Sequence, residues 1–167
     1  MRNTSIIATL ILGTTSLIAP TAGHGQTVHA ALTSHQEVPA LSTPGSGSFS
    51  AKVDLAAGTI HWQMDYTGLE ADATQSHIHF GQRGVNGGVS AFLCSNLGNG
   101  PAGTLACPVR SGQLAGVITA ASVLGPATQG IGPGEFAALA AATLDQTAYV
   151  NVHTVAWPGG EIRGQVR

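Results

Sequence analysis

The feature that most restricts the fold of this chain is an alternation of apolar and polar residues with a period of two. It is clearest at residues 60–67, where Ile60, Trp62, Met64 and Tyr66 alternate with His61, Gln63, Asp65 and Thr67. Because successive side chains of a β-strand point to opposite faces, this segment predicts a strand with one apolar and one polar face. Similar short segments recur along the chain between Gly, Pro, Asn or Asp residues, which favours an antiparallel sandwich or barrel.

The other alternating segments extend this interpretation to the whole domain. We expect strands at about residues 28–33, 49–54, 60–67, 76–81, 89–94, 112–119, 147–154 and 160–166, with a hairpin turn at residues 55–58. A short helix is predicted at residues 136–143, because Gly132 and Pro133 precede an Ala-rich segment with one apolar side. The predicted fold class is all-β: an antiparallel, Greek-key-like sandwich or barrel of about eight strands with one short helix.

The N-terminal residues are typical of a secretory signal peptide. Arg2 provides a positive start, residues 6–18 are almost uninterruptedly apolar, and small residues cluster at 19–25. We therefore expect a signal peptide at residues 1–23 and one domain at residues 24–167, in a secreted or periplasmic protein. A retained anchor or a buried first element is the alternative. No later segment reaches the roughly 18 consecutive apolar residues of a membrane helix, so we expect no membrane span after cleavage.

The charge pattern argues against two classes of partner. Only 8% of the residues are charged, the formal net charge is -2, and Lys52 is the only lysine. Nucleic acids and anionic membranes are bound by clusters of Lys and Arg, so we expect neither as a partner. The chain also lacks a nucleophile with an adjacent base in a recognisable motif, which argues against hydrolytic catalysis.

Two cysteines, Cys94 and Cys107, enclose a Gly-rich segment with little apolar content. In an oxidising compartment we expect them to form a disulfide, which is worth about 3 kcal/mol for a loop of this size in the chain-entropy model. A redox or metal-binding role is the alternative, although the spacing is not Cys-x-x-Cys.

Two histidines at residues 76–81 are candidate metal ligands. His77 and His79 occupy positions i and i+2 of a predicted strand, so their imidazoles project from the same face, while Ile78 and Phe80 point into the core. We expect the face with the imidazoles to be the more polar surface of the sheet. Side chains at this spacing can bind one metal ion.

A third imidazole is available on the strand predicted at residues 147–154. Val150 and Val152 face inward there, and the outer face carries Tyr149, Asn151 and His153. A set of imidazoles suits copper or zinc. We therefore predict that His77, His79 and His153 bind one copper or zinc ion, with hydrogen-bonded structural histidines as the alternative. The other histidines are interpreted as surface residues: His24, His29, His35 and His61.

Two charged residues on the last predicted strand flank the histidine strand. Glu161 and Arg163 lie on its outer face and could form a solvated surface pair worth at most about 1 kcal/mol. Alternatively, Arg163 lies near a metal-bound anion, or either residue holds a histidine in position.

Four motifs, in this order, resemble the CHRD (chordin-type) domain family. They are QEVPA at residues 36–40, HIHFG at 77–81 followed by Asn86-Gly87-Gly88, YVNVHT at 149–154, and GEIRGQV at 160–166. The region from Cys94 to Cys107 and the following SGQLAGVITAASVLGP also resemble secreted bacterial members. The resemblance implies an immunoglobulin-like or superoxide-dismutase-like β-sandwich in an extracellular protein, with no settled catalytic activity. We interpret Asn86-Gly87-Gly88 as a turn that requires positive φ.

A weaker resemblance concerns Cu/Zn superoxide dismutase. It implies that His77, His79 and His153 are copper ligands and that Arg163 guides the anion. The chain departs from that family because no histidine follows the loop at 86–88 and the last two strands are joined by a short connection. Two classes of function remain open. One is an exported binding or structural module for an extracytoplasmic protein or small ligand, which we favour, and the other is a copper-dependent redox enzyme of dismutase-like type.

Overall fold

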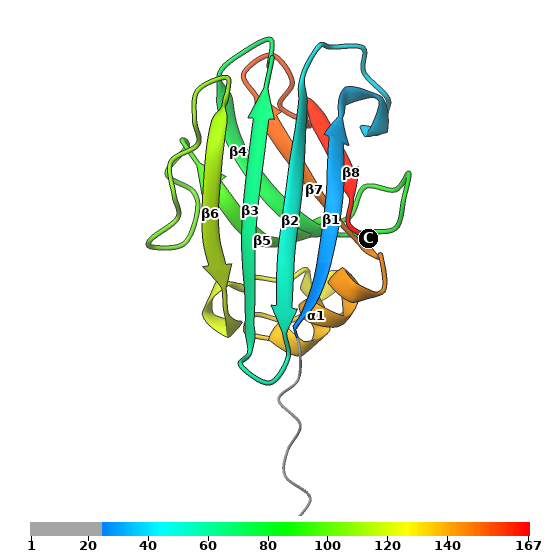
Figure 1. Cartoon of the computed structure of the whole chain (residues 1–167), viewed down its shortest axis with the longest axis vertical. Helices are drawn as coiled ribbons and strands as arrows, with labels where there is room; N and C mark the ends of the chain where they lie inside the picture. Colours follow the sequence, from blue (N-terminus) through cyan, green and yellow to red (C-terminus); the bar gives the residue numbers. More distant parts are fainter. Residues whose placement is uncertain (1–24) are drawn as a thin grey trace, which may run out of the picture.

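The computed structural model describes residues 25–167, which form an antiparallel β-sheet of eight strands with one α-helix (Figure 1). The strands are β1 (Gln26–Thr33), β2 (Ser46–Asp54), β3 (Thr59–Thr67), β4 (Ala73–Phe80), β5 (Gly88–Ser95), β6 (Gly112–Ile118), β7 (Ala148–Thr154) and β8 (Ile162–Gln165), and the helix is α1 (Phe136–Leu144). Short 3-10 segments are η1 (Ser34–Gln36), η2 (Ala120–Ser122) and η3 (Ala127–Gln129). The predicted fold class is confirmed. The predicted signal peptide lies outside the described residues.

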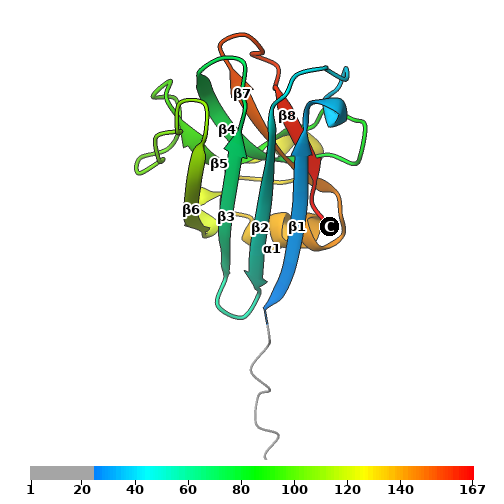
Figure 2. The same ribbon diagram turned by 45° about the horizontal axis from the view of Figure 1, so that its top comes forward.

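The sheet curls into two layers. Its strand order is β5-β4-β7-β8-β1-β2-β3-β6. Figures 1 and 2 show β6, β3, β2 and β1 in one layer, with β5, β4, β7 and β8 crossing behind it. The layers join where β8 meets β1, through the pairing of Thr33 with Arg163 and backbone bonds of His29 to Arg167. The last strand in sequence therefore lies beside the first.

The apolar faces of the strands meet between the layers. The predicted inward residues of β3, from Ile60 to Tyr66, are at most 6% exposed, and Val150 and Val152 of β7 are fully buried. The helix α1 covers one end of this core with Leu139 and Ala140 (Figure 2). The period-two pattern therefore identified the inner face correctly. Among residues 25–167, no helix has the length and apolar character needed to cross a membrane.

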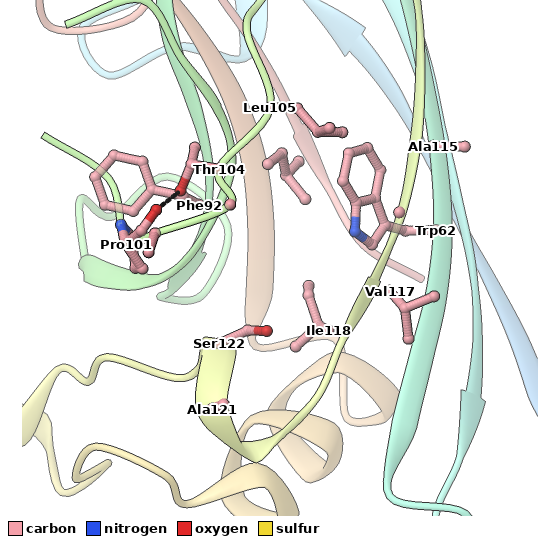
Figure 3. A pocket seen from close by; sticks show the side chains of 14 residues that line it. Trp62, Phe92, Pro101, Thr104, Leu105, Ala115, Val117, Ile118, Ala121 and Ser122 are labelled. Atoms are coloured by element: carbon pink, nitrogen blue, oxygen red, sulfur yellow. Dashed lines mark hydrogen bonds between the residues drawn. The ribbon is translucent and has the colours of Figure 1, made fainter. Parts of the chain in front are cut away.

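The predicted disulfide between Cys94 and Cys107 is formed. Asn96 supports it, because its side chain donates to the Cys107 carbonyl at 3.1 Å and accepts from the Cys107 N–H at 3.0 Å. A cavity of about 370 Å³ lies between the closed loop and β6, with Phe92 and Trp62 on opposite sides (Figure 3). None of the three candidate histidines lines this cavity.

Candidate metal centre

The second face of β4, β7 and β8 is buried, so the prediction of an outer polar surface is wrong. His77, Asn151 and Arg163 on this face are 2–3% exposed. Three connections cover it: residues 81–87 between β4 and β5, residues 34–45 between β1 and β2, and residues 155–161 between β7 and β8. The alternation of residues shows which side chains share a face, but it does not show whether loops cover that face. The candidate site is therefore an interior polar cluster.

The structure brings the three predicted histidines together on adjacent strands. β4 pairs with β7 so that His77 lies opposite Asn151, two residues before His153. His77 Nδ1 and His153 Nε2 are 3.2 Å apart, and one ligand atom from each of the three histidines lies within 4.8 Å of the others. Two nitrogens bound tetrahedrally to one zinc ion at ordinary bond lengths are about 3.3 Å apart. The arrangement can therefore hold a single metal ion.

Backbone carbonyls determine the tautomers of two of these histidines. His79 Nδ1 donates to the carbonyl of Gly87 and His153 Nδ1 donates to that of Pro158, both at 2.9 Å. In a neutral imidazole the other nitrogen then carries a lone pair. Metal-binding histidines commonly use a carbonyl in this way to orient the ring. Nε2 of His79 and Nε2 of His153 are therefore the available ligand atoms.

Burial keeps all three imidazoles neutral. It lowers the pKa of His77 to about 3, with further lowering by the two neighbouring imidazoles. It lowers the pKa of His79 to about 4, although the hydrogen bond to Gly87 acts in the opposite direction. The pKa of His153 is also lowered by burial. Neutral imidazole is the form that binds metals, so the cluster needs no deprotonation at neutral pH.

Two buried nitrogens of the cluster have no hydrogen-bond partner among the described residues. They are Nε2 of His77 and Nε2 of His79. A buried polar atom without a partner costs about 1–3 kcal/mol, so such atoms call for a group that binds them. A cation would satisfy the lone pair of His79 Nε2 and would meet His77 at Nε2 or, after a change of tautomer, at Nδ1. A set of neutral imidazoles suits copper or zinc. The residues present therefore fit such an ion.

Arg163 and Tyr149 hold a loop over the histidines. The Tyr149 ring stacks on His79 with centroids 4.6 Å apart, and the guanidinium carbon of Arg163 lies 3.4 Å from the Tyr149 centroid. Arg163 also donates to Asn86 Oδ1 at 2.9 Å and to the carbonyl of Val85 at 2.7 Å. Because His79 bonds to Gly87 in the same loop, residues 85–87 are fixed above the imidazoles.

Glu161 is fully buried, so its interpretation as part of a solvated surface pair with Arg163 is wrong. Its carboxylate accepts hydrogen bonds from the backbone N–H of Glu70 at 2.9 Å and from Thr154 Oγ1 at 2.8 Å. These bonds connect the end of β7 to residues after β3. Glu161 therefore acts on the histidines only through the backbone of β7, whereas Arg163 acts through Tyr149 and the loop.

Glycines 87 and 88 are needed for space, and the prediction of positive φ there is wrong. The positive φ of this loop is at Gly84, with φ of 76°. A Cβ on Gly87 would collide with the carbonyl oxygen of Phe80, and one on Gly88 would collide with Pro126. The loop therefore approaches the end of β4 closely enough for His79 to reach the Gly87 carbonyl.

Two residues of this cluster were not singled out from the sequence. Glu37 is 6% exposed, and burial raises its pKa to about 7 although Arg163 acts in the opposite direction. Asn151 is 3% exposed and lies between His77 and Arg163 in the sheet. A single acidic residue in a loop and a single amide on a strand do not by themselves indicate a functional site in a sequence, although both residues lie in motifs that carried the CHRD resemblance.

The histidines interpreted as surface residues are exposed where the structure describes them: His29, His35 and His61. His24 lies outside the described residues.

Comparisons with known proteins agree with the motifs. No curated protein and no solved structure matches the chain. A comparison with protein families matches residues 28–166 to the CHRD domain, a range that includes β2 to β8, β1 from Val28 onward and every residue of the histidine cluster. The chain belongs to the CHRD domain family.

Proposed function

We propose that this CHRD domain is an exported binding module that holds one copper or zinc ion through His77, His79 and His153. The observation that carries the proposal is the set of three buried, neutral imidazoles with ligand atoms within 4.8 Å of one another. Two of the nitrogens have no other partner. Bound metal would supply the positive charge that these lone pairs lack and would cross-link β4 to β7.

Export is supported by two features of the chain. The N-terminal residues have the composition of a signal peptide. The domain also contains the disulfide between Cys94 and Cys107, and disulfides persist mainly in oxidising compartments. Copper and zinc would be acquired in that compartment, and the partner would be an extracytoplasmic protein or small ligand.

A binding module is favoured over a dismutase-like redox enzyme by how Arg163 is used. An anion-guiding arginine needs free N–H groups near the metal, but this guanidinium stacks on Tyr149 and donates to two acceptors in the covering loop. The three histidines are at most 7% exposed. A catalytic metal needs an open coordination position and a route for substrate, and this burial argues against such a route.

Metal titration of the purified mature protein tests the proposal. We expect one equivalent of copper or zinc by calorimetry, with a competing chelator present to suppress weak surface binding. His77→Ala removes a ligand and should weaken binding at least about tenfold. His61→Ala is the matched control, because His61 is exposed on β3 and should not affect affinity. Unchanged binding by His77→Ala would refute the site.

A dismutase assay on the copper-loaded protein separates the two classes of function. We expect activity no greater than that of an equal concentration of copper held by His77→Ala or free in the buffer. Activity that requires the intact histidines would support the redox enzyme instead.

A further inference from the structure

A buried amide beside the histidines has an oxygen atom without a partner. Asn151 is 3% exposed and lies on the same face of β7 as His153. In the sheet it pairs with His77 on β4 and with Arg163 on β8, so it occupies the centre of the buried polar face. Its Oδ1 has no hydrogen-bond partner among the described residues. Other atoms near it without a partner among the described residues are Nε2 of His77, Nε2 of His79 and Oε1 of Glu37.

The amide of Asn151 lies between Glu37 and His79. On β7 it stands on the same face as His153 and as Tyr149, whose ring stacks on His79. Its nitrogen end lies on the Glu37 side, because a Cβ built on Gly160 would contact both Asn151 Nδ2 and Glu37 Oε1. Oδ1 is therefore the atom of the amide that faces the histidines.

The orientation of this amide is unfavourable in the absence of a cation. His79 uses Nδ1 to donate to Gly87, so the nitrogen that remains toward the cluster is Nε2, which carries a lone pair. Rotating the amide by a half turn would let Nδ2 donate to that lone pair. In the orientation observed, Nδ2 instead lies on the side of Glu37 Oε1, an acceptor without another partner among the described residues, and Oδ1 is left free.

We propose that Asn151 Oδ1 is a fourth protein donor to the metal, and that Glu37 is a positioning residue that holds the amide in this orientation. The inference rests on the proposed function, because it requires a metal at the three histidines. Amide oxygens serve as weak ligands beside stronger ones in copper sites. One cation would then satisfy both Asn151 Oδ1 and His79 Nε2, which have no other partner among the described residues. It also gives a role to a buried acid that does not contact the histidines directly.

Electron paramagnetic resonance of the copper(II)-loaded full chain tests this inference directly. Asn151→Asp replaces the neutral oxygen by an anionic one of the same shape, so the copper spectrum should shift and the affinity should rise about tenfold. Glu37→Gln should also shift the spectrum and weaken binding about tenfold, the size expected for residues that orient a ligand. Asn99→Asp is the matched control, because Asn99 is exposed in the disulfide loop and should leave both unchanged.

The outcomes distinguish this inference from the proposed function. If Asn151→Asp and Glu37→Gln both retain the wild-type spectrum and affinity while His77→Ala loses binding, the metal site stands and the fourth donor is not Asn151. If the wild-type chain binds no metal, the proposed function itself fails. Thermal unfolding of each variant identifies any that does not fold. A folded Asn151→Asp that keeps the wild-type spectrum and affinity overturns the fourth donor, and a folded Glu37→Gln that keeps them overturns the positioning role of Glu37.

Discussion

At the residue scale, the three histidines differ in how their protons are held. His79 and His153 each donate from Nδ1 to a carbonyl, whereas the ring of His77 meets only other rings: His153 Nε2 at 3.2 Å and the edge of Phe92. Without metal, His77 Nδ1 donates to His153 Nε2 because that nitrogen has only a lone pair. A bound metal would have to replace this hydrogen bond, either by a change of tautomer at His77 or by binding its Nε2. His77 is therefore the histidine whose state would change most on the proposed binding.

Zinc affinity should depend little on pH over the range in which ordinary histidines titrate. A site built from exposed histidines, with pKa near 6.5, loses affinity below that pH because protons compete with metal. Here the pKa values of His77 and His79 are lowered to about 3 and about 4. Competition titrations with zinc from above pH 7 down to about pH 5 should give nearly constant dissociation constants. A loss of about tenfold or more per pH unit below 6.5 would show that the imidazoles are not protected.

At the scale of single elements, the alternation of residues predicted all eight strands and the inner faces of β3, β4 and β7, because a strand's pattern is local. It could not predict the cover on the outer face. The loop at residues 81–87 is held there by Arg163, whose guanidinium comes from β8 near the end of the chain. The Asn86-Gly87-Gly88 run was predicted to be a turn, but the turn lies at residues 83–84 and the run leads into β5. The closeness of the run to β4 is a tertiary contact. The three histidines were predictable because their spacing and their strands were visible locally, whereas the role of Glu37 depends on the packing of a loop.

Arg163→Met should release the loop over the histidines. The substitution removes two charge-assisted hydrogen bonds, to Asn86 and to the Val85 carbonyl, and should destabilise the protein by about 1–3 kcal/mol. Hydrogen exchange should show faster exchange of amides at residues 81–88, and denaturant unfolding should give the change in free energy. Arg83→Met is the matched control, since Arg83 is exposed in the same loop. Equal exchange rates in the two variants would contradict this role of Arg163.

At the scale of the whole molecule, the domain has two interiors on opposite faces of its back layer. One is the apolar core between the layers, and the other is the polar cluster beneath the loops. Burying polar groups gives less stability than burying apolar ones, and the unpartnered nitrogens of His77 and His79 add to the cost of this interior. The single sheet connects the two, because Val150 and Val152 fill the core while Asn151 and His153 on the same strand form the site.

The polar interior also determines how the stability of the metal-free domain depends on pH. The histidines have unfolded pKa values near 6.5 and lower folded values, so below pH 6.5 the unfolded chain binds more protons and the free energy of unfolding falls. Glu37 acts in the opposite direction, because its folded pKa of about 7 exceeds its unfolded value of 4.5 and its protonation favours the folded state on acidification. Three histidines outweigh one carboxyl, so stability should decrease from pH 6.5 to about pH 4.

Urea unfolding of the metal-free protein across this pH range measures the effect. Glu37→Gln removes the opposing contribution, so its free energy of unfolding should fall more steeply with acidification than that of the wild type. In the triple variant, in which His77, His79 and His153 are replaced by Gln, the free energy of unfolding should no longer fall below pH 6.5. Stability that stays constant from pH 6.5 to about pH 4 in the wild type would mean that the imidazoles are hydrated and protonated in the folded state. The buried cluster would then not provide the neutral donors that metal binding requires.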